Sequence, residues 1–160
     1  MTLRCDCLGL ALALVVSASL HGSAWADTFA DGLRAYDAGD YAVTARIWGA
    51  LAEEGDPMAQ LGLAGLYRQG LGVPRDLAEA ARLYRAAAER GNTDAQFNLG
   101  RLYAEGVGVP RDLVEAYVWF GLAAAQGRRG AEERRHELAA ELTPEQLAEA
   151  ERRIAAFRPR

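Results

Sequence analysis

Residues 72–77 read GVPRDL, and residues 108–113 read GVPRDL again. The identity extends outward from this block, since residues 56–91 align without a gap on residues 92–127 with 17 identical positions in 36. Self-similarity at a fixed period of this length is the signature of a repeat protein, in which each unit buries its apolar face against its neighbours. The fold is therefore decided by two copies of one unit rather than by a single globular core.

The first half of each unit predicts a helix. Ala59, Leu63 and Leu66 recur at helical spacing and place apolar side chains on one face. Asp56 offers an N-cap oxygen before this helix, and Gly70 offers a residue that adopts the left-handed conformation after it. The same signals return 36 residues later.

The second half of each unit predicts a loop and another helix. Pro74 cannot continue the first helix, so residues 71–75 are expected to form the loop. Asp76 then opens the second helix, and we expect Glu79 to complete a capping box with it. Arg75 and Arg111 recur with the loop, which favours a structural role such as bonding nearby carbonyl groups or acids over a role in ligand binding.

The remainder of the chain predicts helices at both ends of the stack. Residues 27–55 are expected to form a shorter first pair, with helices over 29–38 and 41–54, and its stretch Tyr36–Tyr41 resembles an ordinary tetratricopeptide unit. After the repeats at 56–91 and 92–127, residues 128–160 are expected to form a polar terminal cap, which solenoids need for solubility. A helix is predicted over 131–141. After an N-cap at Thr143 and a proline at Pro144, a last helix is predicted with Leu147, Ala150, Ile154 and Phe157 on one face. The fold class is all-α, a solenoid of antiparallel helix pairs.

Residues 1–26 have the pattern of a secretory signal peptide. The apolar run Leu8–Leu20 has 13 residues, fewer than the roughly 20 that a spanning helix needs. Arg4 precedes the run, and Ala24-Trp25-Ala26 places small residues where signal peptidase cuts, which predicts cleavage after Ala26. An uncleaved N-terminal anchor is the alternative. With cleavage the protein is expected to be periplasmic or secreted, without membrane insertion.

Composition excludes several kinds of chemistry. The 18 basic residues are all arginine, which excludes a lysine Schiff base and a lysine-bearing phosphate loop. The net charge of −4 gives no support for a nucleic-acid partner. Residues 27–160 contain neither serine nor cysteine, so nucleophilic hydrolysis by either is excluded. His136 stands without catalytic or metal-binding partners, and we expect no catalytic site, metal site or cofactor.

The repeated pattern A-Q-x-x-L-x-x-L-Y-x-x-G-x-G-V-P-R-D-L-x-E-A resembles the SEL-one-like repeat (SLR) family, a subclass of tetratricopeptide-like helical repeats. The two copies cover 72 of the 160 residues. The resemblance implies a right-handed superhelix whose concave face is lined by the first helices. It also implies an adaptor for protein assembly, and exported bacterial members often act in envelope regulation, secretion or polysaccharide export. Cysteine-rich relatives with a disulfide in each repeat have been linked to penicillin binding, and the lack of cysteine in residues 27–160 sets this chain apart from them.

On this resemblance, six residues beside the core positions of the first helices are expected to line a partner-binding groove: Arg34, Leu61, Arg68, Phe97, Arg101 and Glu105. Arginine binds carboxylates through two hydrogen bonds, and Leu61 and Phe97 offer apolar contact. The alternative is an ordinary solvated helix face, with Phe97 buried.

The sequence thus favours a non-catalytic interaction module that binds a protein or peptide of the bacterial envelope. A cell-wall or exopolysaccharide-binding accessory protein is the alternative; it would need exposed aromatic rings, and Trp48 and Trp119 are the candidates for stacking on a glycan. A hydrolase that uses carboxylate pairs is the least favoured reading. An open end of so short a stack leaves a homodimer as a further alternative.

Overall fold

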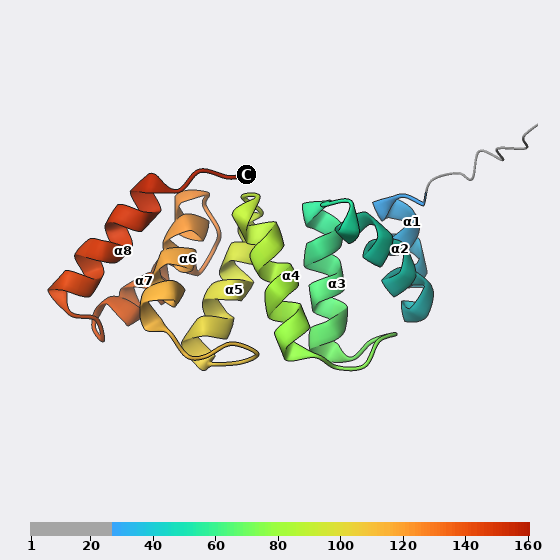
Figure 1. Cartoon of the computed structure of the whole chain (residues 1–160), viewed down its shortest axis with the longest axis horizontal. Coiled ribbons are helices and arrows are strands. Elements are labelled where there is room, and N and C mark those ends of the chain that lie inside the picture. The colour runs from blue at the N-terminus through green and yellow to red at the C-terminus, as the bar shows by residue number, and fades with distance from the viewer. Residues whose placement is uncertain (1–26) are drawn as a thin grey trace, which may run out of the picture.

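A computed structural model describes residues 27–160, and the predicted signal peptide lies outside the described residues. The described part contains eight helices and no strand. In chain order they are α1 (Phe29–Asp37), α2 (Tyr41–Glu53), α3 (Pro57–Gln69), α4 (Leu77–Glu89), α5 (Thr93–Glu105), α6 (Leu113–Ala125), α7 (Ala131–Ala139) and α8 (Pro144–Ala156). Each helix packs against the next along the chain from α1 to α7, and α8 packs on α6. The helices form an elongated stack from α1 to α8 (Figure 1).

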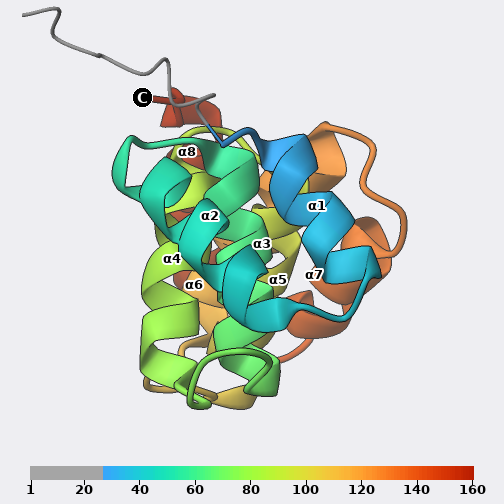
Figure 2. The same cartoon turned by 90° about the vertical axis from the view of Figure 1, so that its right-hand side faces the viewer.

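The stack has two layers. Seen along its axis, the odd-numbered helices α1, α3, α5 and α7 lie on one side and the even-numbered α2, α4 and α6 on the other (Figure 2). We call the outer surface of the odd-numbered layer the first-helix face and that of the even-numbered layer the second-helix face. The all-α solenoid expected from the repeats is confirmed.

The predicted helix ends are correct in most details. The side chain of Asp56 accepts a hydrogen bond from the backbone N–H of Ala59, and Gly70 ends α3 with a φ of 73°. Thr143 forms the expected capping box with Gln146. The helix predicted over 131–141 ends two residues early, at Ala139, because the chain turns there toward the N-cap of α8.

One predicted cap is wrong. The carboxylate of Asp76 accepts hydrogen bonds from the backbone N–H groups of Ala78 and Glu79, but the Glu79 side chain does not return to the cap. It forms two hydrogen bonds with Arg82 instead, at 2.6 and 2.8 Å. A charge-assisted pair one turn further along the helix therefore competes with the capping box and replaces it.

The repeated loops dock on the preceding unit. A β-carbon at Gly72 would lie 2.2 Å from the carbonyl oxygen of Tyr41, the first residue of α2, and φ of Gly72 is +69°. Only glycine suits both that conformation and that approach. The loop is closed by Arg75, whose Nε donates to the carbonyl of Arg68 at 3.2 Å. Arg111 does the same for Ala104 at 3.0 Å, which confirms the structural role predicted for these arginines.

Buried glutamines join successive units. Nε2 of Gln60 donates to the carbonyl oxygen of Ala52 near the end of α2, at 3.1 Å. Gln96 makes the equivalent bond to Ala88 near the end of α4, at 3.2 Å. The repeat thus gives a second hydrogen bond to a helix-terminal carbonyl that also accepts the backbone N–H of Gly55 or Gly91.

The N-terminal end of the core is organised around Trp48, which is 4% exposed. Its indole lies between two glycines of the odd-numbered layer, because β-carbons at Gly32 and Gly62 would lie 2.3 and 2.7 Å from indole atoms. Rings of Phe29 and Tyr36 stack on it at centroid distances of 5.2 and 5.8 Å. This cluster fixes α1 and α2 on α3.

Candidate functional site

The first-helix face carries two hollows. The first, which we call the α1–α5 hollow, has a volume of about 300 Å³ and lies between α1, α3 and α5. Its lining includes Tyr36, Leu61, Gly62, Gly65, Gln69 and Asn98. Gly65 provides space, since no atom lies within 4 Å of a β-carbon placed there, whereas the Trp48 indole fills the space beside Gly62. The result is a mainly uncharged recess between three first helices.

The second, the α5–α7 hollow, has a volume of about 240 Å³ and lies between α5, α6 and α7. Its lining is charged and includes Arg101, Glu105, Arg111, Arg134, Glu137 and Glu141. Arg101 and Glu105 lie 3.6 Å apart as an ion pair, and Arg111 lies 3.6 Å from Glu141. These side chains are about half exposed, so the pairs can exchange partners at little cost.

The two hollows use the same positions of the repeat. Gly65 and Arg101 are equivalent, and Gln69 and Glu105 are equivalent, because each pair is 36 residues apart. Three of the six predicted groove residues, Leu61, Arg101 and Glu105, therefore lie in hollows of one face. The second recess is charged because of these two substitutions and because Arg111, Arg134, Glu137 and Glu141 also line it.

Phe97 lies between the hollows but is partly covered. Its ring packs edge-on against Phe120 at a centroid distance of 5.4 Å. The guanidinium of Arg128 lies over it at 4.7 Å, and Nε of Arg128 lies 2.6 Å from the carboxylate of Asp94. A ligand would reach the Phe97 ring only by displacing Arg128, so the structure gives it a packing role.

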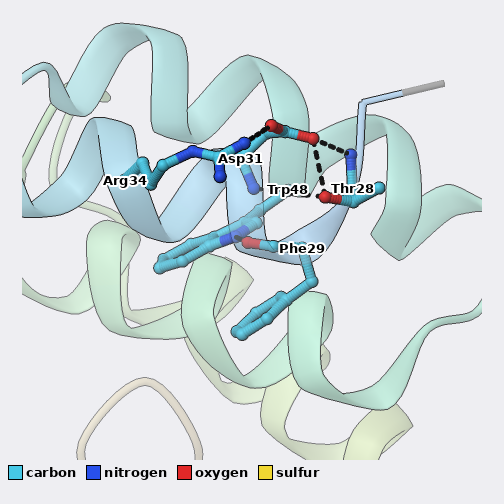
Figure 3. A network of polar contacts seen from close by, with 5 residues as sticks. All are labelled: Thr28, Phe29, Asp31, Arg34 and Trp48. Atoms are coloured by element: carbon cyan, nitrogen blue, oxygen red, sulfur yellow. Dashed lines mark hydrogen bonds and ion pairs between the residues drawn. The ribbon is translucent and has the colours of Figure 1, made fainter. Parts of the chain in front are cut away.

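Arg34 lies apart from both hollows. Its guanidinium binds the carboxylate of Asp31, which also accepts hydrogen bonds from the backbone N–H and the hydroxyl of Thr28 (Figure 3). These hydrogen bonds from Thr28 and the Arg34 guanidinium lower the pKa of Asp31 from 3.8 to about 2. Arg34 thus stabilises the start of α1.

Arg68 is half-buried on α3 and lines neither hollow. Its Nε is buried without a hydrogen-bond partner among the described residues. Its carbonyl accepts the bond from Arg75 that closes the loop. The predicted groove residues therefore do not form one cluster: three lie in hollows, while Arg34, Arg68 and Phe97 lie outside them.

Sequence reasoning missed several residues of this face. Arg134 and Glu137 of α7, and Glu141 two residues beyond its end, line the α5–α7 hollow. Gly65 opens the α1–α5 hollow by lacking a side chain, and Gly62 lines it where the Trp48 indole packs. The signal for the glycines was present as small residues within a helical pattern, where glycine is disfavoured unless packing requires it. No sequence signal places α7 beside α5.

Two carboxyl groups outside these two hollows, Glu79 and Glu145, have a lowered pKa that favours the ionised form. Hydrogen bonds from Arg82 lower the pKa of Glu79, and a backbone N–H and Thr143 lower the pKa of Glu145. A general acid requires the opposite shift. Burial and a hydrogen bond to Glu151 raise the pKa of the Tyr117 hydroxyl to about 12, which disfavours it as a base.

Residues 27–160 contain neither a cluster of metal ligands nor a helix that could span a membrane. Within residues 27–160 there is no group of three or more metal-ligating side chains. His136 is exposed and lies 3.1 Å from Glu132 on the same helix. None of the helices in this range is both long and apolar enough to cross a membrane.

The tryptophans are not available for stacking on a sugar. Trp48 and Trp119 are 4% and 6% exposed. Trp48 lies within the α1–α3 core, and Trp119 packs edge-on against Phe157 at a centroid distance of 6.1 Å. The expectation that these rings stack on a glycan is therefore wrong in its choice of residues, because repeat packing uses both rings internally.

Comparison with known proteins agrees with this architecture. The profile of the Sel1 repeat matches residues 57–92 and 93–127. A search of curated protein sequences finds no match. Among solved structures, the chain is similar to c5321, a protective antigen of uropathogenic Escherichia coli with an SLR fold, with 31% identity over 81% of this chain and a TM-score of 0.75. It is also similar to a Sel1 repeat protein from Oxalobacter formigenes, with 32% identity over 82% of this chain and a TM-score of 0.67.

The chain spans 28% of the length of c5321 and 56% of the Oxalobacter protein, so it matches part of each. Both matches cover the stack of helix pairs, and the profile falls on the two units that repeat the GVPRDL loop. The chain belongs to the Sel1-like repeat family, whose fold is typical of protein–protein interaction modules.

Proposed function

We propose that the protein is an exported, non-catalytic adaptor of the bacterial envelope that binds a protein or peptide along the first-helix face. The observation that carries the proposal is the pair of hollows that share repeat positions on neighbouring units of one face, one lined mainly by uncharged residues and one mainly by charged residues. Peptide-binding surfaces of this kind combine an apolar anchor site with charges that fix orientation.

The hollows suggest the chemistry of the ligand. The α1–α5 hollow offers Leu61 and Tyr36 to an apolar side chain. The α5–α7 hollow offers both guanidinium and carboxylate groups, among them Arg101 and Glu105. We therefore expect a segment with an apolar anchor at one end and charged residues of both signs at the other.

The test is a pair of glycine-to-arginine variants. Gly65→Arg fills the α1–α5 hollow, and no neighbouring atom lies within 4 Å of the new β-carbon, so the variant is expected to fold. Ala50→Arg on α2 is the control, because Ala50 is exposed and lines none of the hollows. Crosslinking in the native envelope followed by mass spectrometry identifies partners of the unaltered protein.

We expect Gly65→Arg to lose the crosslinked partner and Ala50→Arg to keep it. Arg101→Glu should weaken the same complex through the charged hollow. If Gly65→Arg and Arg101→Glu both recover the partner undiminished, the first-helix face is not the binding site. Circular dichroism confirms that each variant has folded.

Export is proposed from the pattern of residues 1–26 alone. N-terminal sequencing of protein from the periplasmic fraction should begin at Asp27. Protein found in the cytoplasm with residues 1–26 attached would contradict export, and a membrane-bound form that retains them would favour the anchor instead.

A further inference from the structure

The last residues of the chain fold back on the second-helix face. The backbone N–H of Arg160 donates to the carbonyl oxygen of Glu89 at 3.0 Å, and its guanidinium lies 3.4 Å from the Glu89 carboxylate. Phe157 packs edge-on against Trp119. Pro159 lies over Gly91, where a β-carbon would be 3.3 Å from the proline ring. We call this site, defined by Glu89, Gly91 and Trp119, the tail groove; Figure 1 shows the chain end running from α8 toward α4.

The preceding unit contains the same site without an occupant segment. The positions 36 residues before Glu89, Gly91 and Trp119 are Glu53, Gly55 and Leu83. All three line a hollow of about 400 Å³ between α2, α3 and α4, which we call the open groove. Its volume is in the range of sites that bind small ligands or single side chains.

Two substitutions explain why this groove is open. In the tail groove, Arg85 covers the ring of Tyr103, with its guanidinium carbon 5.4 Å from the ring centroid. The equivalent residue on α2 is Gly49, so Tyr67 at the equivalent of Tyr103 lines the hollow uncovered. Leu83 is also smaller than Trp119, which leaves further space for an aromatic ring.

The open groove contains polar groups without partners. Glu53 takes part in no ion pair within residues 27–160, whereas its equivalent Glu89 binds Arg160. Gln60 lines the groove at 5% exposure, and its Oε1 has no hydrogen-bond partner among the described residues. In the next unit the same oxygen, on Gln96, accepts a bond from Gln126 at 2.7 Å. Unpaired buried acceptors are rare in folded proteins and indicate a missing donor.

We propose that the open groove binds an extended segment of a partner protein with the pattern aromatic-x-Pro-Arg, in the manner in which the tail groove holds Phe157–Arg160. The aromatic ring would lie on Leu83, the proline on Gly55 and the arginine on Glu53. The carbonyl of Glu53, one of the last of α2, would accept a backbone N–H of the segment. This site is on the face opposite the hollows of the first-helix face.

Arg90 holds the proline position in the unbound protein. A β-carbon at Gly55 would lie 3.0 Å from Nη2 of Arg90, where Gly91 meets Pro159 in the next unit. Arg90 is exposed on a flexible stem, so a ligand can displace it. Because it both fills the position and repels a basic segment, Arg90→Ala should bind the segment more tightly than the unaltered protein.

The experiment titrates a fluorescent peptide with the sequence of residues 154–160 into the purified protein and follows its anisotropy. We expect saturable binding that Gly49→Arg abolishes, since this change places in α2 the side chain that the next unit has at this position. Ala50→Arg is the matched control and should bind normally, because Ala50 is exposed on the same helix and lines none of the hollows. Glu53→Arg should weaken binding about fivefold or more, and its neighbour Glu54→Arg, outside the groove, should not.

Two results would overturn the proposal. The first is the absence of saturable peptide binding. The second is binding that survives Gly49→Arg and Glu53→Arg but is lost in Glu89→Arg, because the peptide then merely exchanges with the protein's own tail. The crosslinking result for Gly65→Arg tests only the proposed site on the first-helix face. The peptide titration tests only the open groove, so either proposal can be wrong while the other holds.

Discussion

The α-carbon of Gly108 lies directly against the peptide carbonyl of Leu77, so closely that a β-carbon would sit 2.1 Å from the oxygen. Leu77 is the first residue of α4, and Gly72 makes the same approach to Tyr41 at the start of α2. Both contacts are between backbone atoms, so a clash with an added β-carbon could not be relieved by rotating a side chain. This contact sets the spacing between successive units.

Gly108→Ala should therefore be strongly destabilising. The left-handed φ of +71° costs an alanine about 1 kcal/mol, and relieving the clash costs about 2 kcal/mol more. Gly127→Ala is the matched control, because Gly127 has a φ of +77° with open space around it and should lose only the first amount. Urea unfolding of both variants measures the difference. Equal losses would show that the loop does not dock as described.

Two glycines on α3 should respond in opposite directions to alanine. A β-carbon at Gly62 would lie 2.7 Å from the Trp48 indole, so Gly62→Ala should lower the free energy of unfolding by about 1–3 kcal/mol. Gly65 has free space, so Gly65→Ala should raise it by up to about 1 kcal/mol through helix propensity. Thermal unfolding gives both values, and near-ultraviolet circular dichroism should report a displaced indole in Gly62→Ala alone. Stabilisation by both changes would contradict the packing of Trp48.

The equivalent glutamines should differ in their contribution to stability. Gln96→Leu removes two side-chain hydrogen bonds, one to the carbonyl of Ala88 and one from the amide of Gln126, which should cost about 1–3 kcal/mol. Gln60→Leu removes only the bond to the carbonyl of Ala52 and an oxygen without a partner among the described residues, so it should cost about 1 kcal/mol less. Chemical denaturation of the two variants compares them. If Gln60→Leu lowers the free energy of unfolding more than Gln96→Leu does, Oε1 of Gln60 accepts a hydrogen bond in the free protein.

Tyr117 should make stability fall at alkaline pH. Its hydroxyl donates to Glu151 at 2.6 Å, and burial together with this bond raises its pKa from 10.0 to about 12. The folded protein thus holds this proton more tightly than the unfolded chain, and the resulting stability is present below pH 10 and lost as the pH rises toward 12.

Measuring the free energy of unfolding of the unaltered protein and of Tyr117→Phe between pH 10 and pH 12 isolates the effect. Tyr117→Phe lacks the hydroxyl, so it should not show the loss of stability that deprotonation of Tyr117 causes. Glu151→Gln keeps an acceptor but removes the charge, so tyrosinate absorbance should show a lower pKa for Tyr117. Identical alkaline stability profiles for the unaltered protein and Tyr117→Phe would show that the Tyr117–Glu151 bond does not form.

Local signals made the helices predictable. Asp56, Gly70 and Thr143 act within one or two turns of their own positions, and the structure finds each in its expected role. Arg75 was assigned correctly because it recurs with the loop that it closes. Glu79 was not, because the competing partner Arg82 lies on the same helix and the sequence alone does not rank two local hydrogen bonds.

The sites depend on contacts between elements far apart in the sequence. Arg101 and Glu105 were correctly placed on the first-helix face, but the residues of α7 that complete their hollow enter through the superhelical path of the chain. Phe97 was expected in the groove, yet Arg128 covers it from the next loop. The contact of residues 157–160 with α4 could not be predicted from hydrophobic periodicity, because an extended segment has no helical period.

The glycine contact at Leu77 also determines how this architecture can grow. The unit of residues 56–91 makes both contacts: Gly72 docks on the unit before it, and the helix start at Leu77 receives Gly108 of the unit after it. A tandem gene duplication of residues 92–127 would therefore insert one complete unit whose two junctions already match. Proteins lengthened in this way would need no new interface between units. Only the helices at the two ends of the stack would differ from the repeated unit.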